Sequence, residues 1–254
     1  RSTLFPYTTL FRSQPLPTAS GTGTTVKVVA STTQICDYVT QLASGDSTDN
    51  LSFDRTGADG QSAHFGADTA TASTHLELTC LLAPNASAHE HEMTAAQSKA
   101  LSEADLFLVS GVDLEHFLDD AVNSTGFKGT MVVTSGVYGA VDVDDLQAQL
   151  KKEESLPYKV DRGTSKVDVA AWPFPPEEGQ SEPEFRFDPH VWTSPKNAIV
   201  QVTNIGAALE KAAPASAETF RAHTDAYIKQ LTELDEWAER LRSEERRVGK
   251  ECRS

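Results

Sequence analysis

Histidine is the residue type whose placement in this 254-residue chain points most directly to chemistry. His89 lies in the segment PNASAHEHEMT, and His190 lies far downstream in the segment FDPHVWTSP. Neither segment is an apolar run, so neither imidazole is expected in an ordinary core position. Imidazole is a common ligand of borderline divalent metals such as Zn²⁺ and Mn²⁺. Both segments are therefore candidates for a metal site.

A carboxylate accompanies each of these two histidines in the sequence. Asp188 precedes His190 by two residues, and Glu90 directly follows His89. A carboxylate that accepts a hydrogen bond from a ligating imidazole fixes the tautomer and the direction of the ring, and we assign this supporting role to Asp188 or Glu90. Spacing alone leaves another interpretation open, because two histidines this far apart are more often surface residues than ligands.

The other five histidines receive different interpretations. His91 is either an auxiliary ligand or a solvated loop residue, and the second interpretation is favoured. His116 lies in the segment LEHFL on a short predicted helix near the mouth of the expected sheet, and it is a further auxiliary candidate. His64 and His75 lie in a polar stretch and are expected at the surface. His223 is expected to pack or to be solvated on a helix.

The elements that must position these residues alternate between strands and helices. Short apolar runs predict four strands, at 26–30, 76–83, 105–110 and 130–134. Helical spacing and capping residues predict helices at 32–43, 94–104, 114–122, 194–212 and 214–241. The alternation favours a four-stranded parallel sheet with flanking helices and right-handed crossovers. In such α/β sheets, ligands bind on the loops beyond the carboxyl ends of the strands.

Three polar segments interrupt this pattern. Residues 44–75, rich in Gly, Asp, Ser and Thr, are predicted to form a surface insertion, and residues 137–187 are predicted to form a long acidic loop. Residues 14–25 are predicted to be a flexible tether. Such a tether suits the spacer that follows a signal peptide or a lipid anchor, and it is equally typical of a disordered end.

The two ends of the chain resemble translated DNA adapters. Residues 1–13 and 242–254 can be back-translated into one DNA sequence and its reverse complement, in register throughout. For example, Phe11 as TTC opposes Glu244 as GAA. We therefore predict that both ends are remnants of a sequencing library and exclude them from the fold. The segment 14–241 between them is then a fragment that is open at both ends.

Composition and motifs argue against several classes of protein. With 37 acidic and 22 basic side chains, the net charge is −15, whereas a nucleic-acid-binding protein needs a basic face. The sequence contains no apolar run of the roughly 18 residues that a membrane-spanning helix needs. It also lacks the GxSxG and GxxxxGK(S/T) motifs. We therefore expect neither a nucleic-acid partner nor an integral membrane protein, and no enzyme of these classes.

Two cysteines lie between the predicted adapter remnants. Cys36 lies in the first turn of the helix at 32–43, and Cys80 lies near the end of the strand at 76–83. If the first two predicted strands are neighbours, the two Cα atoms could come within the separation of about 4.4–6.8 Å that a disulfide needs. An exported protein would keep such a pair oxidised. Two buried free thiols remain the alternative.

Both histidine segments belong to a larger pattern that resembles the metal-specific solute-binding proteins of zinc or manganese ABC importers. Residues 188–195, DPHVWTSP, are similar to the family's Asp-Pro-His-x-Trp-Leu-(Asp/Ser)-Pro. Residues 84–94, PNASAHEHEMT, are similar to its Pro-Gly-x-Asp-Pro-His-x-Tyr-Glu-Pro-Thr. Residues 104–111, ADLFLVSG, resemble its Ala-Asp-hydrophobic strand, and the helix from Pro214 resembles its rigid inter-lobe helix.

This resemblance implies an architecture and a ligand set. It implies that 26–212 is the N-terminal α/β lobe of a two-lobe, periplasmic-binding-protein-like metal receptor, and that 213–241 is the inter-lobe helix. The C-terminal lobe would be missing from this chain. His89 and His190 match the family's first two metal ligands, and the remaining ligands would lie in the missing lobe. The cargo would be Zn²⁺, with Mn²⁺ as the alternative.

The resemblance also implies a cellular role. The receptor would be an extracytoplasmic monomer, either periplasmic or lipid-anchored at the outer face of the cytoplasmic membrane, that delivers metal to an ABC permease and its ATPase. It would be a binding protein and not an enzyme. Two alternatives stay open: a zinc-dependent hydrolase with Glu90 or Glu92 as the base, and a metal-binding surface adhesin.

Overall fold

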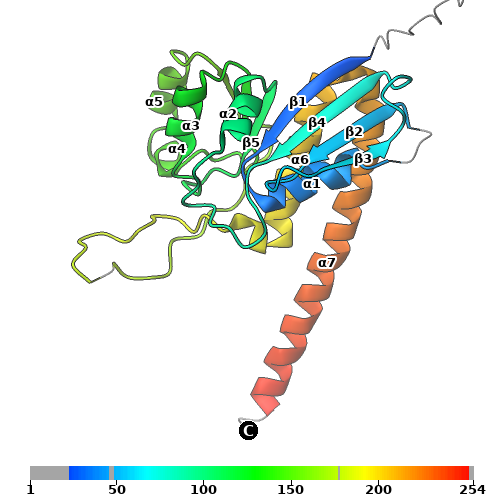
Figure 1. Ribbon diagram of the computed structural model, residues 1–254. Helices are drawn as coiled ribbons and strands as arrows, with labels where there is room; N and C mark the ends of the chain where they lie inside the picture. Colours follow the sequence, from blue (N-terminus) through cyan, green and yellow to red (C-terminus); the bar gives the residue numbers. More distant parts are fainter. Residues whose placement is uncertain (1–22, 46–48, 177, 252–254) are drawn as a thin grey trace, which may run out of the picture.

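The computed structural model describes residues 23–45, 49–176 and 178–251, with side chains described as far as Ser243. Its centre is a seven-stranded sheet in the order β3-β2-β4-β1-β5-β6-β7. Figure 1 labels the strands from β3 to β5. The strands are β1 Thr24–Ala30, β2 Leu51–Thr56, β3 Ser62–Gly66, β4 Thr74–Cys80, β5 Leu106–Val109, β6 Thr130–Val133 and β7 Lys159–Asp161. The helices are α1 Thr33–Ala43, α2 Ala95–Ser102, α3 Leu118–Thr125, α4 Ala140–Asp144, α5 Leu146–Glu153, α6 Pro195–Ala212 and α7 Ala217–Glu251, with 3₁₀ turns η1 Val191–Thr193 and η2 Pro214–Ser216.

The sheet is parallel except at one edge. Every neighbouring pair of strands runs parallel apart from β2 and β3. The predicted α/β class is therefore confirmed, and the four strands predicted from apolar runs are present as β1, β4, β5 and β6. The predicted number of strands is wrong, because β2, β3 and β7 also join the sheet. β1 begins at Thr24, within the segment predicted to be a tether.

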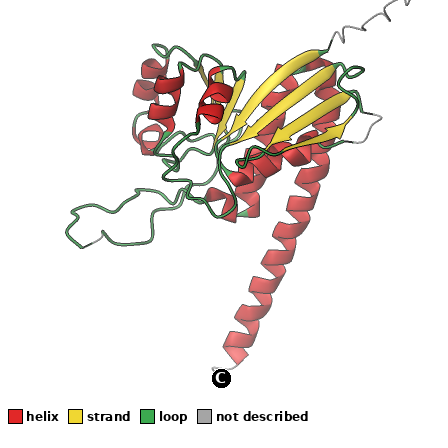
Figure 2. Cartoon of the chain, in the orientation of Figure 1, coloured by secondary structure: helices red, strands yellow, loops and turns green. Residues whose placement is uncertain are grey.

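Helices cover both faces of the central strands (Figure 2). Successive side chains of a strand point to opposite faces, so alternate residues enter two different cores. In β1, Val28 packs with α1, α6 and α7, whereas Val29 packs with α2 and α3 on the other face. Leu108 and Phe107 of β5 divide in the same way. Burial on both faces explains why these strands appear as continuous apolar runs in the sequence.

The segment 44–75, predicted to be a surface insertion, instead contributes β2 and β3 to the sheet. Phe53 of β2 is fully buried beside Leu76 of β4, and its ring lies 5.3 Å from that of Phe65 on β3. The opposite face carries polar side chains such as Asp54, which is 40% exposed. A strand with one solvated face alternates polar and apolar residues. The polar residues outnumber the apolar ones in this segment, so its composition resembles that of a loop.

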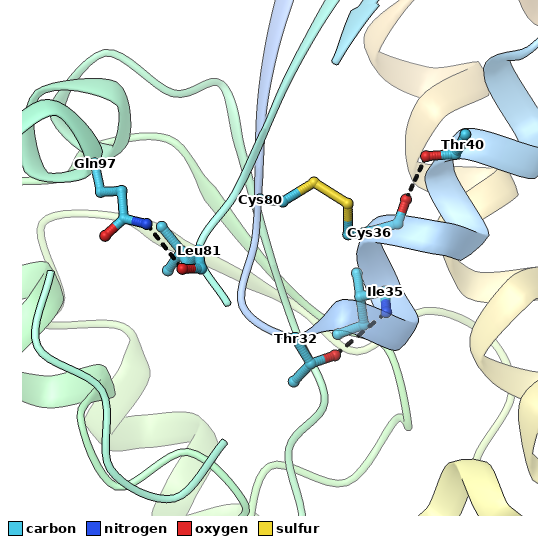
Figure 3. The surroundings of a disulfide bond; sticks show 7 residues. All are labelled: Thr32, Ile35, Cys36, Thr40, Cys80, Leu81 and Gln97. Atoms are coloured by element: carbon cyan, nitrogen blue, oxygen red, sulfur yellow. Dashed lines mark hydrogen bonds between the residues drawn. A yellow bond between two sulfur atoms is a disulfide. The ribbon is translucent and has the colours of Figure 1, made fainter. Parts of the chain in front are cut away.

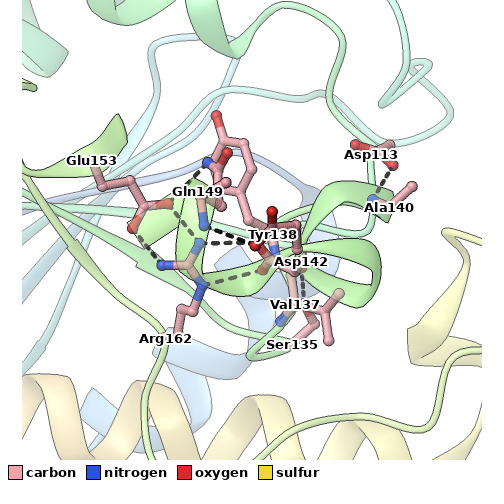
Figure 4. Close-up of polar contacts among 11 residues, drawn as sticks. Asp113, Ser135, Val137, Tyr138, Ala140, Asp142, Gln149, Glu153 and Arg162 are labelled. Atoms are coloured by element: carbon pink, nitrogen blue, oxygen red, sulfur yellow. Dashed lines mark hydrogen bonds and ion pairs between the residues drawn. The ribbon is translucent and has the colours of Figure 1, made fainter. Parts of the chain in front are cut away.

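The segment 137–187, predicted to be one long loop, forms α4, α5 and β7 before it becomes irregular. Arg162, directly after β7, donates hydrogen bonds to Asp142 of α4 and to Glu153 of α5 (Figure 4). The donor–acceptor distances are 2.5–3.1 Å. This buried ionic cluster ties the two short helices to the sheet. Hydrophobic periodicity could not reveal helices that polar contacts hold in place.

Two helices begin where the sequence predicts, although only one has the predicted side-chain cap. The side chain of Thr94 accepts from the N–H of Gln97 at 3.2 Å, and the side chain of Gln97 accepts from the N–H of Thr94 at 3.0 Å. This reciprocal capping box begins α2. α6 begins at Pro195, after Ser194, although the side chain of Ser194 makes no capping hydrogen bond. Proline suits the first helical position because the missing N–H would have no partner there.

The long helix predicted from residue 214 is present as α7, preceded by η2. Phe220 and Leu231 pack into the core with α1 and α6. Farther along, the helix extends away from the sheet (Figure 1) and carries exposed apolar side chains: Leu234, Trp237 and Leu241. α7 continues to Glu251, through residues predicted to be an adapter remnant. Their Glu- and Arg-rich sequence has a high helix propensity.

Part of the predicted N-terminal organisation cannot be compared with the structure. The adapter remnant 1–13 and residues 14–22 of the predicted tether lie outside the described residues. In the part of the chain that the structure describes, no helix combines the length and the apolar character needed to cross a lipid bilayer.

A disulfide between Cys36 and Cys80 ties α1 to the end of β4 (Figure 3). β1 and β4 are neighbouring parallel strands, with Ala30 paired to Cys80. Because α1 begins soon after β1 ends, its first turn lies over the end of β4, and the two Cα atoms are 5.6 Å apart. The sequence left open either a disulfide or two buried free thiols, and the structure contains the disulfide.

Replacing Arg162 with methionine should strongly destabilise the fold. The side chains of Arg162, Asp142 and Glu153 are 11%, 3% and 9% exposed, so the variant leaves two buried carboxylates without a cation. We expect the free energy of unfolding, measured by urea denaturation, to fall by about 3–5 kcal/mol. The matched control is Arg186→Met, whose half-exposed ion pair with Asp144 should contribute at most about 1 kcal/mol. Equal losses in the two variants would contradict this account.

Removing the disulfide with the double variant Cys36→Ser, Cys80→Ser should also destabilise the protein. The cross-link joins residues 44 positions apart. In the chain-entropy model, closing a loop of that length lowers the conformational entropy of the unfolded chain, which raises its free energy by about 4 kcal/mol. We expect urea denaturation to show a loss of roughly 2–5 kcal/mol relative to the oxidised protein. A reducing agent should lower the stability of the original chain but not that of the variant. A double variant as stable as the oxidised chain would refute the stabilising role of the disulfide.

Candidate metal centre

His89 lies on the loop that leads from the carboxyl end of β4 to α2. The disulfide at Cys80 anchors the start of this loop, and the capping box at Thr94 anchors its end. Asn85 turns the chain in the left-handed region, with φ of 67°, which asparagine adopts more readily than most residues. The N–H of His89 donates to Oγ of Ser87 at 3.2 Å. These contacts hold the imidazole at the carboxyl edge of the sheet.

His190 lies directly before η1 and α6, at the end of the irregular segment that follows β7. Oδ1 of Asp188 accepts from the backbone N–H of His190 at 3.0 Å and from its Nδ1 at 2.8 Å. The N–H of Asp188 donates to the carbonyl of Ala170 at 2.8 Å, which ties the turn to the preceding segment. Asp188 is therefore placed to orient the ring of His190, whereas Glu90 is exposed on its loop.

Two buried amides on α6 fix the position of His190 relative to the sheet. Nε2 of Gln201 donates to Oγ1 of Thr134 at 3.0 Å and to Oγ of Ser110 at 3.3 Å. Nδ2 of Asn204 donates to the carbonyl of Thr134 at 2.9 Å. Ser110 and Thr134 directly follow β5 and β6. Because both amides are buried, these hydrogen bonds hold α6 at the carboxyl edge with little competition from water.

The rings of His89 and His190 meet at this edge, with centroids 5.4 Å apart and an interplanar angle of 81°. Nδ1 of His89 lies 3.0 Å from the carbonyl oxygen of Leu114, just as Nδ1 of His190 faces Asp188. Because both partners are acceptors, each Nδ1 acts as the donor, and in the neutral form of such a ring the lone pair is on Nε2. In this tautomer an imidazole can bind a metal through Nε2.

Aromatic side chains surround the two imidazoles. The buried ring of Phe185 lies 5.2 Å from that of His89. Trp172 stacks on His190 at 6.0 Å, and Trp192 meets the same ring edge-on at 5.3 Å. These rings cover part of each imidazole, and the side chain of His190 remains 34% exposed.

Of the two auxiliary candidates, the structure brings only one next to the pair. The ring of His116 lies 5.8 Å from His89 and stacks on Phe185 at 5.6 Å. The ring of His91 instead meets Phe117 edge-on at 5.3 Å, on a different part of the surface. Burial lowers the pKa of His91, which favours its neutral form. His116 is thus the auxiliary candidate that contacts His89.

The remaining histidines lie elsewhere. Nδ1 of His64 on β3 is 2.7 Å from Asp54, and His75 on β4 faces the same carboxylate. His223 lies on α7 and contacts the carbonyl of Leu42. Within residues 23–45, 49–176 and 178–251, no group of three or more His, Cys, Asp or Glu side chains is arranged to hold a metal ion. A pair of imidazoles supplies two of the four ligands of a tetrahedral site.

Sequence reasoning missed three buried polar residues that position the histidines. They are Glu115, Gln201 and Asn204. Burial raises the pKa of Glu115, although hydrogen bonds to its carboxylate oppose that shift. The signal that could have revealed these residues is a polar side chain within an apolar stripe. Gln201 and Asn204 follow Ala198 at helical spacing, on the face of α6 that enters the core.

Comparisons with known proteins identify the family of this chain. The family model described as zinc-uptake complex component A, periplasmic, matches residues 28–248. The zinc-binding protein AdcA of Streptococcus pyogenes is 30% identical over 164 residues, which cover 63% of this chain and 28% of that protein. The manganese-binding lipoprotein MntA of Bacillus subtilis is 27% identical over 164 residues, 65% of this chain and 42% of that protein. The periplasmic zinc-binding protein TroA of Treponema pallidum shares 20% identity and a TM-score of 0.50, over 86% of this chain and 55% of that chain.

These similarities carry different weights. The chain spans less than half the length of the two curated relatives that it matches. The likeness to TroA shows the fold alone. The family model extends over most of the chain and includes both histidine segments and the strands that carry them. The chain belongs to the family of the periplasmic component A of zinc-uptake complexes.

Proposed function

We propose that this chain is the N-terminal part of the substrate-binding component of a zinc ABC importer, with manganese as the alternative cargo. The receptor captures a divalent ion between two lobes outside the cytoplasm. It then delivers the ion to a membrane permease, whose transport an ATPase drives. Membership of a zinc-uptake family supports the transport role.

The observation that carries the proposal is the pair of imidazoles at the carboxyl edge of the sheet. His89 and His190 are the first two proposed ligands, with His116 as an auxiliary candidate. A hydrogen-bond acceptor faces Nδ1 of each of the first two rings, so in the neutral ring the proton lies on Nδ1 and the lone pair of Nε2 is free for the metal ion. Zn–N bonds are about 2.0–2.1 Å long, so modest movements of two rings 5.4 Å apart would bring both nitrogens to one ion.

The other ligands of the proposed site come from a second lobe. A tetrahedral zinc site needs four ligands, and the relatives are more than twice as long as the part that this chain matches. α7 is the proposed inter-lobe helix. Its exposed Leu234, Trp237 and Leu241 form an apolar stripe beyond the sheet that a second lobe would cover.

The choice between zinc and manganese depends on the missing ligands. A third imidazole would favour zinc, whereas two carboxylates would favour manganese. The names of the relatives include both a zinc-binding and a manganese-binding protein. Zinc is proposed because the matching family model is that of a zinc-uptake component.

The proposed location is outside the cytoplasm. The relatives include one named as a lipoprotein and one named as periplasmic, and we propose a monomer that is either periplasmic or lipid-anchored. The disulfide between Cys36 and Cys80 supports this location, because disulfides persist in oxidising compartments. In the same proposal, the ends 1–13 and 242–254 are adapter remnants.

The two alternatives from the sequence gain no support. A zinc-dependent hydrolase would need a base beside the ion, but Glu90 and Glu92 are both exposed on the loop of His89. No feature of the described residues favours a surface adhesin. The proposal is therefore a metal-binding transport receptor, in keeping with the family.

The chain by itself should bind zinc only weakly, because two of the four proposed ligands come from elsewhere. We expect isothermal titration of the chain with zinc chloride to give a dissociation constant in the micromolar range or weaker. Tight binding of one equivalent would contradict the proposal, since it would require a complete site within this chain.

His89→Ala and His190→Ala should each weaken this residual zinc binding by about tenfold or more, because each removes one of two ligands. The matched control is His64→Ala, which removes an exposed histidine that pairs with Asp54 on the open sheet face. Long-range ¹H–¹⁵N spectra should show zinc shifting the Nε2 signals of His89 and His190 but not those of His64. Zinc binding that survives when both His89 and His190 are replaced by alanine, but is lost in the control, would place the ion on the sheet face.

A further inference from the structure

One buried carboxylate holds the turn between β5 and α3. Oε1 of Glu115 accepts from Oγ of Ser31 and from the N–H of Ser110, both at 2.6 Å, and Oε2 accepts from the N–H of Gly111 at 3.1 Å. Ser31 directly follows β1, and Ser110 directly follows β5. These strands are neighbours at the centre of the sheet. The side chain of Glu115 therefore links the ends of two central strands to the turn.

The same turn contains strained backbone. Gly111, Val112 and Asp113 have φ values of 82°, 57° and 57°. Glycine adopts this left-handed region freely, but a β-branched residue such as valine does so only at a cost. Strained residues persist where their surroundings determine the conformation. The hydrogen bonds to Glu115, together with the bond from the N–H of Val112 to the carbonyl of Val137 at 2.9 Å, supply that restraint.

The turn presents the carbonyl group that orients His89. Leu114 directly precedes Glu115, its side chain is fully buried, and its carbonyl oxygen lies 3.0 Å from Nδ1 of His89. The N–H of Leu114 donates back to the carbonyl of Gly111 at 3.2 Å. If the turn relaxed, the carbonyl of Leu114 would move. Nδ1 of His89 would then lose the acceptor that keeps a proton there.

We propose that Glu115 is a positioning residue for His89. Its carboxylate holds the strained turn so that the carbonyl of Leu114 keeps Nδ1 of His89 protonated and leaves the Nε2 lone pair for the ion. The inference rests on the proposed function, since the tautomer of His89 matters for transport only if this ring is a ligand. A residue with a merely structural role would change stability and leave the tautomer of the folded chain as it was.

The variant Glu115→Gln tests this role in the full chain without metal. Glutamine keeps the size of the side chain, but an NH₂ group replaces one carboxylate oxygen. This NH₂ group would face one of the groups that donate to Glu115, so that hydrogen bond would be lost. In long-range ¹H–¹⁵N spectra, we expect His89 of the original chain to carry its proton on Nδ1. In the variant, we expect the ratio of the Nδ1–H to the Nε2–H form to fall roughly tenfold, the order of magnitude that the loss of one hydrogen bond implies.

Two controls accompany this measurement. Asp119→Asn changes an exposed carboxylate in the first turn of α3 and should leave the tautomer of His89 unchanged. His190 serves as an internal control, because its Nδ1 faces Asp188 and not the turn. If Glu115→Gln does not fold, Ser31→Ala replaces it, since that variant removes only one donor from the same carboxylate. A smaller shift in the same direction is expected there.

An unchanged His89 tautomer in whichever of these variants folds would overturn the inference. A shift confined to His89 would support it, whereas an equal shift at His190 would indicate general loosening and would also overturn it. The spectra are recorded without metal, so they remain informative if the proposed function is wrong. Zinc that binds the original chain but leaves the signals of His89 unperturbed would refute the function and not the positioning role.

Discussion

Parallel pairing of β4, β1, β5 and β6 is the constraint on which the rest of the structure depends. Parallel strands bring their carboxyl ends to one edge of the sheet, and each connection must then cross one of its faces. The loop after β4, the turn after β5 and the start of α6 consequently reach the same edge from distant parts of the sequence. His89 and His190 meet there because the topology leaves their segments no other edge to occupy.

Apolar packing alone does not fix the geometry at this edge. The two cores hold helices against the faces of the sheet, but they leave freedom in how far each helix slides along it. Buried polar groups remove that freedom: Gln201 and Asn204 attach α6 to the ends of β5 and β6, and Glu115 attaches the turn after β5 to the end of β1. Hydrogen bonds between buried groups are strengthened by the low local dielectric, so these contacts are suited to hold the imidazoles in a fixed orientation.

The strands with two buried faces and the two histidine segments could be predicted, because their signals are local in the sequence. β2 could not be predicted, because its solvated face carries residues such as Asp54 that make the composition resemble a loop. α4 and α5 depend on Arg162, which follows them in the chain and pairs with both. The approach of His116 to His89 depends on a left-handed backbone at Val112, which no local propensity favours. Contacts between distant residues decide these features.

The most direct test of the central claim is zinc-edge anomalous diffraction from crystals, grown with zinc, of a protein that contains both this chain and the proposed second lobe. The account predicts one ion bound by Nε2 of His89 and Nε2 of His190 at about 2.0–2.1 Å, with its other ligands contributed by residues that follow α7. An ion that binds only one of the two imidazoles, or neither of them, would contradict the account.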